Sequence, residues 1–170
     1  MALVAATLGS GLASMEPTST EADAISAFAS AWDAYFAEAS VMGVSATPGS
    51  YAVGLSAMQV AMSGMSAAGA GAQAVQLGIQ AFWNAILALG PAIWTVPPPS
   101  VIVPPLVAPT GISGIAADLA GKFASNTSGK LDLVAAANEV ANVIHPAGGV
   151  GGIANVQTAP SPTPAPTPIL

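Results

Sequence analysis

The segment from Ala39 to Ala117 contains no Asp, Glu, Lys or Arg, although it makes up almost half of the 170-residue chain. A typical soluble protein has about one charged residue in four, whereas this chain has 6%. An uncharged segment of this length can cross a membrane, form the core of a globular domain, or form a surface that other subunits cover. The helices within it help to choose among these three alternatives.

Helical periodicity dominates residues 18–145. In the first predicted helix, Thr18 and Glu21 have the spacing of a capping box, in which each side chain satisfies a free backbone N–H group. Apolar residues then recur on one face of the helix, and polar residues recur on the other. The apolar face consists of Ile25, Phe28, Trp32, Tyr35, Phe36 and Ala39. We expect an amphipathic helix with this face in the core.

The second predicted helix begins near Pro48 and has methionines at helical spacing. Met58, Met62 and Met65 lie on one face of it, with serines and a glutamine opposite. Methionine is flexible and polarizable, so such a stripe fits either an adaptable binding surface or the filling of gaps in a core. Small residues such as Gly54 would also let another helix approach closely.

The third predicted helix lies in "QAVQLGIQAFWNAILALGPAIW", residues 73–94. Gln73, Gln76, Gln80 and Asn84 form one narrow polar stripe, while the rest of the helix, including Phe82 and Trp83, is apolar. A helix of this kind is mostly buried, and Gly90 and Pro91 are expected to end it.

A membrane span is not expected in this helix. The stretch from Ala74 to Leu89 has 16 residues, fewer than the roughly 20 that cross a bilayer core. No Lys or Arg flanks it to fix an orientation. The mean hydropathy of +0.67 nevertheless keeps one alternative open, a membrane-active helical protein such as a lysis or pore component.

Proline sets the remaining divisions of the chain. The segment 96–110 has prolines at a density that favours an extended polyproline conformation, and its apolar residues Val101, Ile102 and Val103 should lie against protein. A helical hairpin follows over 110–145. Residues 1–17 are interpreted as an N-terminal arm, either ordered or a short helix, and residues 146–170 as a low-complexity Gly/Pro-rich tail. The predicted fold is therefore all-α, with about five helices in a small bundle, an extended Pro-rich connector and a Pro-rich C-terminal tail.

The residue inventory argues against several classes of function. Lys122 and Lys130 are the only basic residues apart from His145, and nucleic-acid binding requires many cationic side chains. The chain has no Cys and a single His, so we expect no catalytic residues, no metal site, no cofactor and no small-molecule substrate. The N-terminus lacks the basic region of a secretory signal, and secretion by a signal peptide is not expected.

Three segments carry a family resemblance. "AFASAWDAYFAEASV", "GAGAQAVQLGIQAFWNAI" and "FASNTSGKLDLVAAANEVANVIH" together resemble small Ala-rich virion structural proteins of tailed bacteriophages, over roughly Thr18 to His145. The resemblance implies a non-enzymatic component of the tail, neck or capsid accessory set, located in the virion and assembled in the host cytoplasm. It transfers no functional residue.

The residues agree with this implication, because they present more apolar surface than a free monomer normally exposes. The expected partners are other virion proteins and copies of the same chain. The candidate interface consists of Met58, Met62, Met65, Gln76, Gln80, Phe82, Trp83, Val101, Ile102 and Val103.

Overall fold

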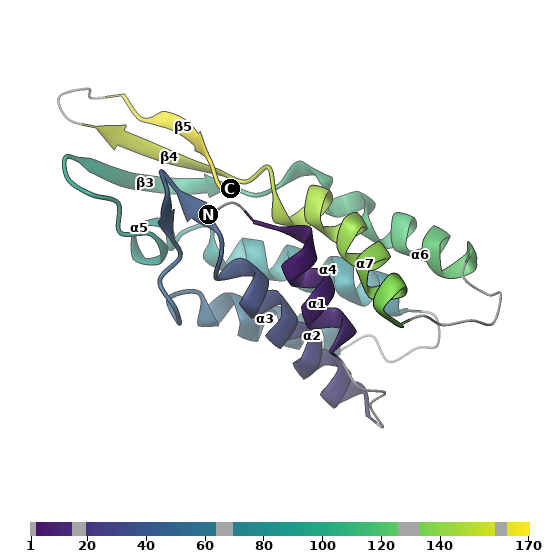
Figure 1. Ribbon diagram of the computed structural model, residues 1–170. Coiled ribbons are helices and arrows are strands. Elements are labelled where there is room, and N and C mark those ends of the chain that lie inside the picture. The colour runs from purple at the N-terminus through teal and green to yellow at the C-terminus, as the bar shows by residue number, and fades with distance from the viewer. Residues whose placement is uncertain (1–2, 15–19, 64–69, 126–132, 159–162) are drawn as a thin grey trace.

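The computed structural model describes residues 3–14, 20–63, 70–125, 133–158 and 163–170. It combines helices with two antiparallel sheets (Figure 1). The helices are α1 (Ala5–Ala13), α2 (Glu21–Phe36), α3 (Ala52–Ser63), α4 (Gly71–Ile86), α5 (Gly90–Ile93), α6 (Ile115–Ser125) and α7 (Leu133–Ile144). The strands are β1 (Ser40–Val41), β2 (Val44–Ser45), β3 (Ser100–Val107), β4 (Ile153–Thr158) and β5 (Ala165–Pro168). A 3₁₀ turn, η1 (Thr110–Gly114), precedes α6, and a π-helical turn, η2 (His145–Gly149), follows α7.

The prediction of an all-α bundle is wrong, because the two Pro-rich regions supply a three-stranded sheet in the order β3-β4-β5. Ser100 of β3 pairs with Thr158 of β4, and the register becomes irregular between Val103 and Val107, where the two prolines of β3 lie. β5 pairs with the other side of β4. Both Pro-rich strands are therefore edge strands, where proline is tolerated because only one side of the strand needs ladder hydrogen bonds.

The longer helices pack in a closed circuit. α1 contacts α2, α2 contacts α3, α3 contacts α4, α4 contacts α6, α6 contacts α7, and α7 returns to α1. Figure 1 shows the three-stranded sheet at one end of this bundle, with α5 beside β3. The predicted N-terminal arm thus contributes α1, a helix that packs between two others.

The helix α2 confirms the predicted apolar face. All six residues of that face are buried, although Ala39 lies just after the end of α2, and the polar positions opposite them are exposed. The capping residue differs from the prediction, because Thr20 caps the helix and accepts a hydrogen bond from the Asp23 backbone N–H at 3.2 Å. The spacing of Thr20 and Asp23 repeats the capping-box pattern two residues later, and Thr18 lies outside the described residues.

Two glycines allow α3 and α4 to pack closely. A Cβ atom on Gly54 would lie 2.7 Å from Ile86 Cγ2, and one on Gly78 would lie 2.7 Å from Met62 Cγ. The expected close approach at Gly54 is therefore observed, and α4 is the helix that makes it. This packing places Met58 and Met62 in the core.

Aromatic side chains form the centre of the core. Phe36 contacts Phe82, Tyr51, Trp83 and Trp94, with ring centroids 4.7 to 5.9 Å apart. The indole N–H of Trp83 donates to the Gly148 carbonyl at 2.7 Å, and that of Trp94 donates to the Ala39 carbonyl at 3.0 Å. These bonds connect the helical core to the turns that lead into the two sheets.

The C-terminal residues close the sheet end of the molecule. Ile169 is buried, and its N–H donates to the Gly152 carbonyl. Leu170 and Ser40 exchange two backbone hydrogen bonds of 2.7 and 3.0 Å. The Gly/Pro-rich segment that composition assigned to a tail therefore contributes strands and core residues.

Candidate interaction surface

Charged side chains are confined to a few elements. The described ones are Glu21, Asp23, Asp33, Glu38, Asp118, Lys122 and Glu139. They belong to α2 and the turn after it, to α6 and to α7, whereas α3, α4, α5 and all the strands have none. In Figure 1 the three-stranded sheet and α5 lie at the opposite end of the molecule from α6. One end of the molecule is thus built of elements that have no charged residue.

Within the helical bundle, α3 also has no charged residue, and its large exposed apolar residues are Val53 and Val60, with exposed fractions of 53% and 73%. Ser56 and Ser63 are also exposed, and they alternate with the two valines at steps of three and four residues. Residues at these steps share one helix face. We name Val53, Ser56, Val60 and Ser63 the α3 outer face.

A groove borders the α3 outer face. It has a volume of about 280 Å³ and lies between α2 and α3, lined by Ala22, Ile25, Ser26, Gln59, Val60 and Ser63. Its lining contains no charged side chain. A neighbouring protein could therefore place an apolar side chain in the groove without leaving a charge unpaired.

The structure places five of the predicted interface residues inside the molecule. Met58, Met62, Phe82, Trp83 and Ile102 are buried. Met58 and Met62 pack against Gly78 of α4, and Phe82 and Trp83 belong to the aromatic core. These side chains are therefore not available for contact with a partner protein.

The other predicted interface residues are dispersed. Gln76 accepts a hydrogen bond from the Ala116 N–H at 2.9 Å and so joins α4 to α6, whereas Gln80 is exposed. Val101 is exposed on the edge strand β3, and Val103 is half-buried. Met65 lies outside the described residues.

Sequence reasoning missed the α3 outer face itself. The available signal was the pair Val53 and Val60, which are seven residues apart on the side of the helix that the serines had marked as polar. The stronger methionine signal directed the interface prediction to the opposite side of α3.

The single histidine belongs to an internal polar cluster. Nδ1 of His145 lies 2.7 Å from the hydroxyl of Tyr35, and a Cβ on Gly149 would collide with that hydroxyl. Burial lowers the pKa of His145, while burial, together with the charge of Glu38, raises the pKa of Tyr35. The imidazole is therefore neutral near pH 7, and the histidine tautomer sets which of the two groups donates the hydrogen bond.

This cluster has the geometry of a structural contact. Tyr35 is fully buried, so its hydroxyl cannot reach a substrate from solvent. Glu38 accepts a hydrogen bond from the Thr7 hydroxyl at 3.0 Å, which joins α1 to the end of α2. Among the described residues, no group of His, Asp and Glu side chains could hold a metal ion.

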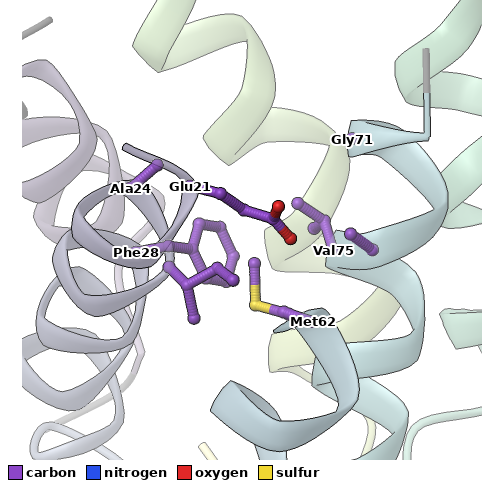
Figure 2. A pocket seen from close by; sticks show the side chains of 8 residues that line it. Glu21, Ala24, Phe28, Met62, Gly71 and Val75 are labelled. Atoms are coloured by element: carbon purple, nitrogen blue, oxygen red, sulfur yellow. The ribbon is translucent and has the colours of Figure 1, made fainter. Parts of the chain in front are cut away.

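A second hollow lies between the first turns of α2 and α4 and the last turn of α3. It has a volume of about 250 Å³, and its lining includes Phe28, Met62 and Val75. Figure 2 shows the carboxylate of Glu21 extending from α2 toward Val75, near Phe28 and Met62. We name this hollow the α2–α4 pocket.

The described helices include none that is both long enough and apolar enough to cross a membrane. No family model, no curated protein and no solved structure matches the chain.

Proposed function

We propose that the chain is a non-enzymatic structural subunit of a phage virion, in the tail, neck or capsid accessory set, and that it acts through protein–protein contacts. The observation that carries the proposal is the α3 outer face, where two valines are more than half exposed on a helix with no charged residue. Its partners are copies of the same chain and other virion proteins. The virion assignment also uses the resemblance of three helical segments to small Ala-rich phage proteins.

Exposed apolar residues without neighbouring charges favour association, because their burial releases about 25 cal/mol per Å² of apolar surface. Charged residues are depleted at the centre of protein interfaces, and α3 has none. The groove beside Val60 adds a concave feature that a partner side chain can fill.

The size of α3 limits the strength of a single contact. A 12-residue helix is about 18 Å long and about 10 Å wide. One face of α3 therefore covers roughly 180 Å², much less than the roughly 800 Å² that each partner buries in a standard interface. One α3 contact is therefore weak. Repeated contacts between many subunits of a particle would raise the overall affinity through effective concentration.

Sedimentation of the purified protein at several concentrations tests self-association. Because a single α3 contact is weak, we expect the wild-type chain to be multimeric at the highest concentrations and to dissociate on dilution. Val60→Glu should shift it toward the monomer, because a carboxylate would have to be buried at the contact. Since Val60 is exposed, its replacement should leave the melting temperature of the monomer nearly unchanged.

Val134→Glu is the matched control. Val134 is 57% exposed on α7, which already has Glu139, so this variant should remain multimeric. A wild-type chain that is a monodisperse monomer at every concentration would contradict self-assembly. Detection of the chain in purified particles tests the virion assignment separately, and recovery only in membranes of lysed host cells would contradict it.

A further inference from the structure

The α2–α4 pocket is apolar inside and has one charged group. Its lining includes Ala24, Phe28, Met62 and Val75 beside Glu21. Glu21 is an exposed residue at the start of α2, whereas Phe28 and Met62 are buried. The carboxylate therefore lies on the solvent side of the pocket, and the apolar groups lie deeper.

With a carboxylate at the solvent side and apolar side chains deeper in the pocket, the site favours a ligand that has a cationic end and an apolar end. The apolar part of the ligand should enter the pocket, and a cationic group should remain near the surface, within reach of Glu21. An anionic ligand would instead meet the repulsion of the carboxylate.

The volume limits the size of the ligand. An apolar cavity of about 150 Å³ in another protein binds benzene, and this pocket has about 250 Å³. The additional space suits a short arm attached to a ring. The ring of Phe28 provides an aromatic surface for such a ligand.

A lysine side chain of a partner protein fits this order poorly. Its ammonium group is at the tip, so insertion would bury the charge beside Phe28 and Met62 and leave the alkyl stem near Glu21. A small free amphiphile has the opposite arrangement, with the ammonium group at the solvent end.

We propose that the α2–α4 pocket binds a small organic ammonium ion with an apolar body about the size of a benzene ring. The ligand would be held and not converted, since the pocket offers one carboxylate and no second reacting group. This site lies beside the assembly function proposed above and does not depend on it.

Three probes of similar size test the proposal with the full chain: 2-phenylethylammonium, the neutral 2-phenylethanol and the anionic 3-phenylpropionate. Their binding can be followed by NMR through the backbone amide shifts of Ala24, Gly71 and Ala74. We expect the ammonium ion to bind most tightly, with the alcohol weaker by about twofold to fivefold, as for a solvent-exposed ion pair. The carboxylate should bind most weakly.

Two variants identify the groups involved. Glu21→Gln should reduce the affinity for the ammonium ion to that for the alcohol and leave the alcohol unaffected. Gly71→Leu should reduce the shifts from all three probes, because Gly71 lines the pocket and the added side chain would take up space at its edge. A Cβ at this position would have no atom within 4 Å. That open space also implies that the variant will keep its fold, which its melting temperature can verify.

Some outcomes would overturn the proposal. One is the absence of shifts with every probe, as expected if another part of the chain or a second copy fills the pocket. Another is equal affinity of the wild-type protein for the ammonium ion and the carboxylate. Shifts that persist unchanged in Gly71→Leu would place the binding elsewhere on the protein and would also exclude this site.

Discussion

At the scale of single residues, Tyr35 and His145 show how a buried contact sets protonation. Burial lowers the pKa of His145, so the folded state favours the neutral imidazole, which is hydrogen-bonded to the Tyr35 hydroxyl. The unfolded chain has a histidine pKa of about 6.5. Between that value and the lower value in the folded protein, the unfolded state binds more protons, and folding becomes less favourable as pH falls.

We therefore predict that His145→Gln will weaken the pH dependence of stability below about pH 6.5. Urea unfolding at pH 7, 6 and 5 should show a free energy of unfolding that falls more steeply with acidification in the wild type than in the variant. Tyr35→Phe is the comparison, because it removes the hydrogen bond but keeps the burial that lowers the histidine pKa. This second variant should retain the wild-type slope, and equal slopes for His145→Gln and the wild type would contradict the prediction.

The sequence located His145 correctly at the end of a helix, but it did not identify its partner. Tyr35 lies 110 positions away, and its place on the core face of α2 does not indicate which turn will cover its hydroxyl. That information comes from the packing of η2, where Gly149 leaves room for the tyrosine. Contacts of this kind depend on the tertiary fold and have no local signal.

At the scale of elements, α3 shows what periodicity can and cannot predict. The spacing of Met58, Met62 and Met65 indicated one side of a helix. It did not show that α4 would cover that side and leave Val53 and Val60 exposed. The glycines provide the missing information, since Gly54 and Gly78 mark the faces along which the two helices approach.

Gly54→Ala should destabilise the protein. A Cβ at this position would lie 2.7 Å from Ile86 Cγ2 and 2.8 Å from the ring of Phe82, and the ring is fixed in the aromatic core. Overpacking of this kind costs about 1–3 kcal/mol, which exceeds the roughly 0.5–1 kcal/mol that alanine contributes over glycine in a helix. The free energy of unfolding should therefore decrease.

Gly121→Ala is the control for helix propensity alone. No atom lies within 4 Å of a Cβ built on Gly121, an exposed residue of α6. This variant should be more stable by roughly 0.5–1 kcal/mol. Chemical denaturation of both variants measures the difference, and a stabilising effect of Gly54→Ala would show that the α3–α4 contact is looser than these distances imply.

The strand β4 could not be predicted from its own residues, because the strands that pair with it lie in other segments of the chain. Residues 153–157 alternate buried Ala154 and Val156 with half-buried neighbours, but they lie within a Gly/Pro-rich segment that resembles a linker. β3, whose residues precede those of β4 by about 50 positions, supplies their hydrogen bonds. Composition indicates the conformation that a segment favours in isolation. Here, pairing with edge strands that are distant in sequence determines the conformation.

At the scale of the whole molecule, the end of the chain completes the core. Ile169 has an exposed fraction of 1%, and a Cβ on Gly152 would lie 3.2 Å from its Cδ1 atom and 2.9 Å from Trp83. The two backbone bonds between Leu170 and Ser40 fix the chain beside β1. The last residues therefore connect the sheet to the aromatic centre of the helical bundle.

This arrangement predicts different effects for two adjacent residues. Ile169→Ala should lower the free energy of unfolding by about 2–5 kcal/mol, the range for a buried isoleucine replaced by alanine. Leu170→Ala should change it by roughly 0.5 kcal/mol or less, since that side chain is 51% exposed and its backbone bonds are retained. Urea unfolding followed by tryptophan fluorescence would report both effects. Equal and negligible effects would mean that the C-terminal segment is dispensable, as the tail-like composition of residues 146–170 implies, whereas a loss confined to Ile169→Ala would establish that the packing of this side chain couples the sheet to the bundle.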